Sequence, residues 1–338
     1  MSLNTYLIPP FLFLCYRLSV ILFSFCCACP DENRGRDILL LSVLLLSACK
    51  PKAQDAEKKT FPPLVVGVLP DVDSVPFVIA DMQGFYKEAG LDVRLEHFTS
   101  PVNRDAALQA GQIDGAISDL LAAAFALEGG FPVYVTQGTD GSYKLAVSST
   151  SGIQAIKDLP GKTVAISKNT IIEYTLDRML KENSIPEDKV EKVAIPQIPV
   201  RLQMLKEGKV DAAVLPEPLA SSAAKDGLAI VGSSNELSIN PGVMLFSKTS
   251  YEAKRDAIER LAVPYNRAVD YLAETDRSVY MKELITRASF PEDVIDSIAL
   301  PSYSHSRQVD ESEVLAVSSW LLERSLVKRA YSLKDFLP

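Results

Sequence analysis

An internal repeat constrains the fold of this chain more than any other feature. The segment LQAGQIDGAIS at 108–118 matches LKEGKVDAAVL at 205–215, so each residue of the second copy stands 97 positions after its counterpart. The same offset places VGVLPDVD (66–73) over TVAISKNT (163–170). Two matches at one offset predict two similarly built lobes, each with the order strand, helix, strand, helix, strand.

The residue pattern inside each copy predicts the α/β class. In the first copy one helical face carries Val75, Val78, Ile79, Met82, Phe85 and Tyr86. Gly90 then ends the helix, and apolar residues alternate over 91–95 as in a strand. In the second copy Thr170 and Glu173 have the spacing of a capping box. Short helix–strand connections imply right-handed parallel units.

The first 63 residues have the organisation of a leader followed by a tether. All five cysteines lie within the first 49 residues, and RGRDILLLSVLLLSACKPK joins a basic segment to a short apolar one that ends at Cys49. Leu46-Ser47-Ala48-Cys49 resembles a bacterial lipobox, whose cysteine is acylated and becomes the mature N-terminus. The alternative is an uncleaved anchor helix. We therefore predict a leader over 1–48, a lipidated tether over 49–63, and a lipid-anchored protein on the extracytoplasmic side of a membrane. The second apolar run, within 1–30, is best explained by a translation start placed too far upstream.

Charge and composition exclude several functions. The net charge of -8 argues against nucleic acid, whose phosphates require a basic surface. The only histidines are His97 and His305, and no cysteine lies near either of them. We therefore expect neither a metal site nor a cofactor.

The expected topology predicts where a ligand binds. In open α/β sheets, ligands bind beyond the carboxyl ends of the strands, near helix N-termini. If the two lobes face each other, both sets of strand ends line one cleft. The predicted ligand-binding residues are Asp71, Asp73, Ser74, Phe77, Ser118, Asp119 and Asp140 in the first lobe, and Ser167, Asn169, Thr170, Glu173, Tyr174 and Glu217 in the second.

Three segments carry a resemblance to a known family. DLPGKTVAIS, NTIIEYTLDRML and RLQMLKEGKVDAAVLPEPLAS resemble the solute-binding proteins of ABC importers, from about residue 64 to the C-terminus. The similar group includes binders of the thiamine pyrimidine precursor, aliphatic sulfonates, taurine and nitrate. The resemblance implies a type II periplasmic-binding fold that closes around a small-molecule ligand, with an ABC permease and its ATPase as partners and a monomeric state. It implies lobe 1 over 64–148 and 240–338, and lobe 2 over 149–239.

The nature of the ligand follows from the charges in the predicted cleft. The acids there are Asp71, Asp73, Asp119, Glu173 and Glu217. The only basic residue in the predicted cleft is Lys168. Because unpaired buried carboxylates are costly, the pattern favours a ligand that is a cation or an N–H-rich ring. Phe77 and Tyr174 could stack on a flat ring. In the alternative interpretation, Glu173 only completes the capping box, Asp73 caps a helix and Phe77 belongs to the core.

A thiamine pyrimidine precursor is the leading candidate, followed by a different organic nitrogen compound and then a sulfonate. Enzymes of pyrimidine or menaquinone precursor metabolism share the fold implied by the resemblance. The pyrimidine synthases carry a cysteine-rich motif, whereas this chain has clustered cysteines only in its leader. We therefore expect a binding protein and not an enzyme, and a sensor or structural lipoprotein is the remaining alternative.

Overall fold

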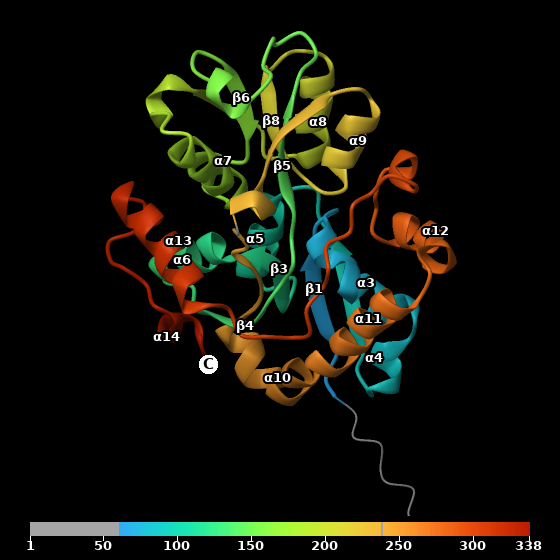
Figure 1. The fold of residues 1–338 in the computed structure, drawn as a ribbon. Helices are drawn as coiled ribbons and strands as arrows, with labels where there is room; N and C mark the ends of the chain where they lie inside the picture. Colours follow the sequence, from blue (N-terminus) through green and yellow to red (C-terminus); the bar gives the residue numbers. More distant parts are fainter. Residues whose placement is uncertain (1–60, 238) are drawn as a thin grey trace, which may run out of the picture. The chain divides into compact units, whose positions relative to one another are not determined.

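A computed structural model describes residues 61–237 and 239–338. The predicted leader and Cys49 lie outside the described residues. The described chain contains two five-stranded mixed sheets, which define lobe 1 and lobe 2 below (Figure 1). The predicted α/β class is therefore confirmed, whereas the exact lobe boundaries stay a prediction.

The sheet of lobe 1 has the strand order β2-β1-β3-β10-β4. Strands β1 and β3 are parallel, with Val66 opposite Gly115, and β10 runs antiparallel to both β3 and β4. The strands are β1 (Leu64–Val68), β2 (Val93–His97), β3 (Gly115–Asp119), β4 (Val133–Gly138) and β10 (Gly242–Ser247). The helices between them are α3 (Val75–Met82), α4 (Phe85–Glu88), α5 (Pro101–Gln109) and α6 (Leu120–Glu128).

The sheet of lobe 2 has the corresponding order β7-β6-β8-β5-β9. Its strands are β5 (Tyr143–Val147), β6 (Thr163–Ile166), β7 (Glu191–Ala194), β8 (Ala212–Pro216) and β9 (Ala229–Ser233), and its helices are α7 (Ile171–Glu182), α8 (Ile198–Lys206) and α9 (Leu219–Lys225). In each sheet the fourth strand, β10 or β5, is the antiparallel one and follows a crossing from the other lobe. The two lobes thus have the same topology, and the chain passes between them from β4 to β5, over 139–142, and again from β9 to β10.

The repeat seen in the sequence is also present in the structure. Helix α8 stands 97 positions after α5, and β8 stands 97 positions after β3, with identical lengths. Gly111 and Gly208 end the repeated helices with φ of 69° and 65°, left-handed angles that glycine adopts without strain. Asp114 and Asp211 are also equivalent, because each carboxylate accepts a backbone N–H at 2.8 Å from a neighbouring strand of its lobe, from Val65 of β1 and from Thr163 of β6.

One predicted helix is interrupted. The apolar face over 75–86 suggested a single helix ending at Gly90, but α3 ends at Met82 and α4 begins at Phe85. Gly84 between them has a φ of 71°, outside the helical region. The break leaves both segments against the same core, because the buried Val78 of α3 and Tyr86 of α4 belong to one cluster.

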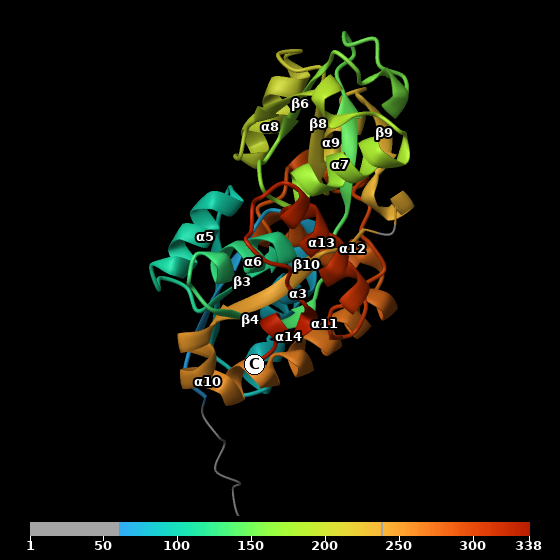
Figure 2. The same cartoon turned by 90° about the vertical axis from the view of Figure 1, so that its left-hand side faces the viewer.

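The C-terminal helices pack mainly on lobe 1. They are α10 (Lys248–Arg260), α11 (Ala262–Glu274), α12 (Arg277–Arg287), α13 (Glu311–Glu323) and α14 (Leu333–Phe336). Helix α11 lies along α3, and α13 lies beside α6, as both views show (Figures 1 and 2). The helix-rich end of the chain therefore packs chiefly on lobe 1. None of the helices in the described part of the chain has both the length and the apolar composition needed to cross a bilayer.

Candidate functional site

A small cavity lies where the strand ends of the two lobes meet. Its volume is about 30 Å³, space for no more than a few water molecules, so the lobes are closed on each other. Its lining residues are Leu69, Asp71, Asp73, Pro101, Arg104, Ile117, Ser118 and Asp119 from lobe 1, and Tyr143, Ile171, Ile172, Ile198, Arg201 and Pro216 from lobe 2. The position beyond the strand ends is the one predicted from the sequence.

Asp71 lies in the loop that follows β1 and is buried, with 7% of its surface exposed. Ser74 Oγ donates to Asp71 Oδ1 at 3.0 Å and also to the carbonyl of Leu69 at 3.0 Å. Burial, followed by the nearby charge of Asp73, raises the pKa of Asp71 well above its usual value. A ligand N–H or cation at this carboxylate would favour its charged form.

Asp73 joins the first loop to a segment that connects the lobes. Its carboxylate accepts hydrogen bonds from Thr139 Oγ1 at 2.6 Å and from the Tyr143 hydroxyl at 2.9 Å. The side chain makes no helix-capping hydrogen bond, so the capping role considered from the sequence is wrong. Burial raises the pKa of Asp73 to about 6, despite these two donors. A Cβ added to Gly141 would lie only 2.4 Å from Asp73 Oδ2, which explains the need for glycine at this position.

Asp119, at the end of β3, contacts both lobes. Its Oδ1 accepts the N–H of Ala122 at 2.8 Å and caps α6, while its Oδ2 lies 3.5 Å from the N–H of Ile171 in lobe 2. Burial raises the pKa of Asp119, although the neighbouring charge of Arg104 opposes that shift. Ser118 lines the same cavity, and its hydroxyl has no hydrogen-bond partner among the described residues.

The remaining polar residues of the prediction do not line the cavity, and most have structural partners. Asp140 accepts from Ser304 N at 2.7 Å and pairs with Arg307, which ties the connecting segment to the C-terminal region. Glu217 is fully buried, pairs with Lys144 and accepts the N–H of Ser221.

The loop before α7 is held by its own hydrogen bonds. Thr170 Oγ1 accepts the N–H of Ile172 at 3.2 Å, and Glu173 accepts the N–H of Asn169 at 2.7 Å and pairs with Lys192. Both hydrogen bonds are displaced by one residue from the predicted capping box, since Thr170 accepts from Ile172 instead of Glu173 and Glu173 accepts from Asn169 instead of Thr170. Ser167 is buried beside this loop, and its carbonyl accepts from Thr170 Oγ1.

The two aromatic residues proposed to stack on a ligand lie in the core. The ring of Phe77 packs against that of Tyr265, with centroids 4.9 Å apart. The ring of Tyr174 meets that of Trp320 edge to face, with centroids 5.7 Å apart, and the Tyr174 hydroxyl accepts a hydrogen bond from Arg178. Neither ring lines the cavity, because an early position in a helix does not decide which way a side chain faces.

The structure places two buried arginines in the cavity wall, and we did not predict either of them. Burial alone lowers the pKa of Arg201 to about 9, and among the described residues no carboxylate offsets that effect. Burial also opposes the charge of Arg104, but the carboxylates of Asp105 and Asp119 outweigh it and raise the pKa of Arg104. The repeat offers a signal for both, since Arg201 stands 97 positions after Arg104. The cavity wall therefore carries more positive charge than the sequence pattern indicated, and the exposed Lys168 is not among its lining residues.

Contacts beside the cavity also join the lobes. In lobe 2, Asp177 accepts from Trp320 Nε1 at 3.1 Å and from Arg324 at 2.9 Å, both in or just after α13. Ser222 of α9 donates to Asp293 at 3.0 Å. These contacts stabilise the closed arrangement without involving the cavity.

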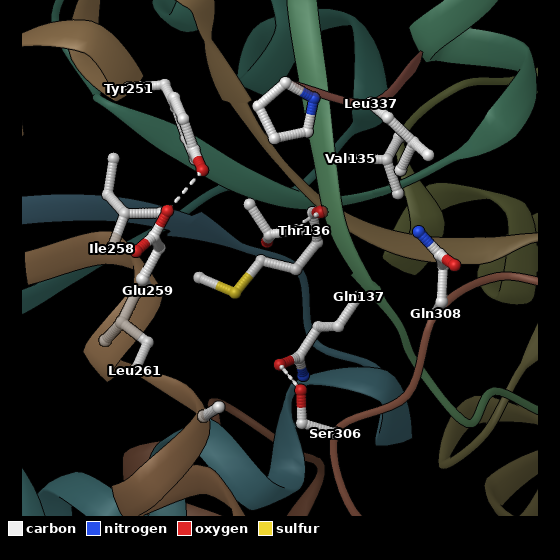
Figure 3. Close-up of a pocket in the computed structure, with 13 residues that line it drawn as sticks. Val135, Thr136, Gln137, Tyr251, Ile258, Glu259, Leu261, Ser306, Gln308 and Leu337 are labelled. Atoms are coloured by element: carbon white, nitrogen blue, oxygen red, sulfur yellow. Dashed lines mark hydrogen bonds between the residues drawn. The ribbon is translucent and has the colours of Figure 1, made fainter. Parts of the chain in front are cut away.

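A larger cavity, of about 260 Å³, lies in lobe 1 away from the strand ends. Figure 3 shows its mixed lining, in which Ser306 donates to Gln137 and Tyr251 donates to Glu259. Its walls come from the sheet, α10 and the C-terminal segment, with no contribution from lobe 2. Closure of the lobes would therefore not enclose a molecule bound there.

No cluster of potential metal ligands is present in the described chain. The arrangement that the structure does provide is a small, charged cavity between the lobes, with carboxyl groups from lobe 1 and one arginine from each lobe. Such a cavity can recognise a small polar solute by hydrogen bonds and charge.

Comparisons with known proteins agree with this architecture. A protein of Brachyspira hyodysenteriae described as an ABC transporter periplasmic binding protein is 26% identical over 264 residues, covering 73% of this chain and 75% of the relative. A Bacillus subtilis protein described as binding aliphatic sulfonates is 24% identical over 262 residues, covering 72% and 75%. The alkanesulfonate-binding protein of Xanthomonas axonopodis pv. citri, solved with MOPS, superposes with a TM-score of 0.72 at 19% identity, covering 83% of this chain and 99% of that one.

The fold is thus the type II periplasmic-binding fold. The nitrate-binding protein of Synechocystis has the same architecture, with a TM-score of 0.61 at 14% identity, covering 79% of this chain and 82% of that one. The profile of the family described as NMT1/THI5 like matches residues 71–274, which is more than half of the chain. The chain belongs to the NMT1/THI5-like family.

Proposed function

We propose that this protein is the solute-binding component of an ABC importer and captures a small organic nitrogen-containing solute between its two lobes. The solute would then pass to a membrane permease driven by its ATPase partner, and the binding protein itself would act as a monomer. The family, the two-lobed fold and the described relatives support the transport role. The chemistry of the cavity supports the class of solute.

The burial of the Asp71 carboxyl in the cavity wall is the single observation that most favours a nitrogen-containing solute. It is a buried carboxyl whose hydrogen bonds come from Ser74, and it lines a cavity to which the other lobe contributes the opposite wall. Ionising a buried carboxyl is costly when a single serine supplies its hydrogen bonds, so an N–H group or a cation of the solute would supply the missing interaction. Asp119 offers a second carboxyl nearby, whereas Asp73 is already bonded to two hydroxyls.

A thiamine pyrimidine precursor remains one candidate within this class. Its amine and ring nitrogens suit carboxylates. Phe77 and Tyr174 are core residues, however, so neither ring is available to stack on the pyrimidine. The lobes would have to stand further apart than they do here to admit any flat ring, since the cavity measures about 30 Å³.

Isothermal titration calorimetry with the wild type, Asp71→Asn and a matched control tests the proposal. Probes are 4-amino-5-hydroxymethyl-2-methylpyrimidine, small amines and amino acids, ethanesulfonate and nitrate. We expect a nitrogen-containing probe to bind the wild type and to bind Asp71→Asn about 10- to 100-fold more weakly, the scale of a lost hydrogen bond to a charged group. Asp92→Asn, an exposed site, should bind like the wild type. Binding only of ethanesulfonate or nitrate, unaffected by Asp71→Asn, would refute the nitrogen-containing class.

We further propose that the mature chain is anchored through acylated Cys49, on the extracytoplasmic face of the membrane. The lipobox-like Leu46-Ser47-Ala48-Cys49 and the polar segment after it support this assignment. Incorporation of labelled palmitate should require Cys49, and Cys49→Ser should accumulate as an unprocessed precursor. A mature N-terminus mapped to any other residue would overturn the assignment.

A further inference from the structure

The two cavity arginines occupy equivalent positions in the two lobes. Arg104 lies in the first turns of α5 and Arg201 lies at the same place in α8, 97 residues later. Their exposed fractions are 2% and 0%, and both side chains line the cavity between the lobes. The two copies of the repeat share only part of their sequence. Both nevertheless place a buried guanidinium at the cavity, one from each lobe.

The hydrogen bonds of Arg201 leave most of its donors unused. Nη1 donates to the carbonyl of Ile195 at 3.0 Å, while Nε and Nη2 have no hydrogen-bond partner within residues 61–237 and 239–338. Structural support of one carbonyl does not require an arginine, because a neutral side chain can make the same bond. A buried guanidinium without a counter-charge is destabilising unless something pairs with it.

Arg104 is better compensated but also retains donor capacity. Its Nε donates to Asp105 at 2.8 Å and its Nη1 donates to the carbonyl of Ile117 at 3.0 Å. Its Nη2 lies 2.8 Å from the same Asp105 oxygen as an ion pair, yet it makes no aligned hydrogen bond in the described chain. Each lobe thus presents a fixed guanidinium with an unused N–H at the same cavity.

We propose that Arg104 and Arg201 form a clamp for one oxyanion group of the solute, with one arginine from each lobe. The proposal rests on the function proposed above and narrows it. If Asp71 binds an N–H group or a cation and the arginines bind a carboxylate, sulfonate or phosphonate, the solute is a small zwitterion. The planar fork of a guanidinium suits such an oxyanion, and Lys would not replace it.

The placement of the clamp also couples binding to closure. A ligand shifts an equilibrium only by its differential affinity for the two states. An oxyanion held by Arg104 in the open form gains Arg201 only when the lobes close. An anionic group that contacts both arginines therefore favours the closed state, whereas a group held by one lobe alone does not.

Thermal shift and calorimetry on the ligand-stripped full-length protein test the clamp. The probes are β-alanine, 2-aminoethanesulfonate and 2-aminoethylphosphonate as zwitterions, with ethylamine, propionate, ethanesulfonate and 4-amino-5-hydroxymethyl-2-methylpyrimidine as partial or neutral comparisons. We expect at least one zwitterion to bind at least 10-fold more tightly than the amine or the anion alone. Arg201→Gln and Arg104→Gln should each weaken that binding at least 10-fold, while Arg94→Gln, at an exposed arginine, should not.

The outcomes separate the two proposals. If the pyrimidine or ethylamine binds at least as tightly as every zwitterion, the clamp is refuted and the proposed function stands. If a zwitterion binds equally well to the wild type and to both arginine variants, the clamp is likewise refuted. If no probe binds the wild type and native mass spectra show no retained solute, both proposals fail.

Discussion

Replacing Arg201 with methionine should stabilise the ligand-free protein. The side chain is fully buried, and its pKa falls from 12.5 to about 9 through burial alone. At about 1.36 kcal/mol for each pH unit, this corresponds to a cost of about 5 kcal/mol for holding the charged form. The guanidinium is still charged at pH 7, so the wild type bears that cost.

Two effects reduce the gain that would be measured. The variant loses the hydrogen bond from Nη1 to the carbonyl of Ile195, worth about 1 kcal/mol, and methionine fills the space of the guanidinium only approximately. We therefore expect the free energy of unfolding to rise by about 1–4 kcal/mol, the range found when buried charges are replaced by apolar side chains.

Urea denaturation at pH 7 measures this difference, after bound solute has been removed by unfolding, dialysis and refolding. Arg94→Met, at an exposed arginine, is the control and should change stability by no more than about 0.5 kcal/mol. A decrease in the unfolding free energy of Arg201→Met by 1 kcal/mol or more would refute the reasoning. It would mean that Arg201 is a structural residue whose charge is already compensated.

Three further predictions concern contacts around the cavity. In the folded protein the pKa of Asp73 is about 6, against an ordinary value of 3.8, so its carboxyl stays protonated to a higher pH than in the unfolded chain. The wild type should therefore lose about 2–3 kcal/mol of stability relative to Asp73→Asn as the pH rises from 4 to 7. Denaturant melts in which the two proteins show parallel pH profiles would contradict this. Gly141→Ala should lower the unfolding free energy by about 1–3 kcal/mol, because the new Cβ would lie 2.4 Å from Asp73 Oδ2 and 2.8 Å from the Tyr143 hydroxyl; an unchanged midpoint of thermal unfolding would show that the loop yields without cost. Trp320→Phe keeps an aromatic ring but loses the indole N–H donor to Asp177 and part of the buried ring volume, so urea melts should show a loss of unfolding free energy of about 1.5–3 kcal/mol. A change below about 0.5 kcal/mol would show that this contact does not stabilise the closed lobes.

The fold could be predicted because its signals are periodic and local. The offset of 97 residues alone pairs β3 with β8 and α5 with α8. The break between α3 and α4 could not be predicted in this way, because the apolar face continues across it and Gly84 alone marks it. A hydrophobic pattern reports which side of a segment is buried, and it is less sensitive to a single non-helical residue.

The site was only partly predictable, for a different reason. Asp71 and Asp119 line the cavity because they follow strand ends, whose place is set by the topology of the sheet. Phe77 and Tyr174 instead pack into hydrophobic clusters. Arg201 was missed because it lies inside a helix, and because arginine is seldom buried without a partner. Side-chain direction and unpaired burial both depend on packing between segments far apart in sequence.

Native mass spectrometry of the protein purified from cells under non-denaturing conditions tests the central claim most directly. If the cavity between the lobes holds a solute through Asp71, the wild type and Asp92→Asn should carry a small-molecule adduct that exchanges on dialysis and is absent, or at least 10-fold depleted, in Asp71→Asn. An adduct of equal abundance in all three proteins would place the bound molecule elsewhere. It would contradict the assignment of this cavity as the ligand site.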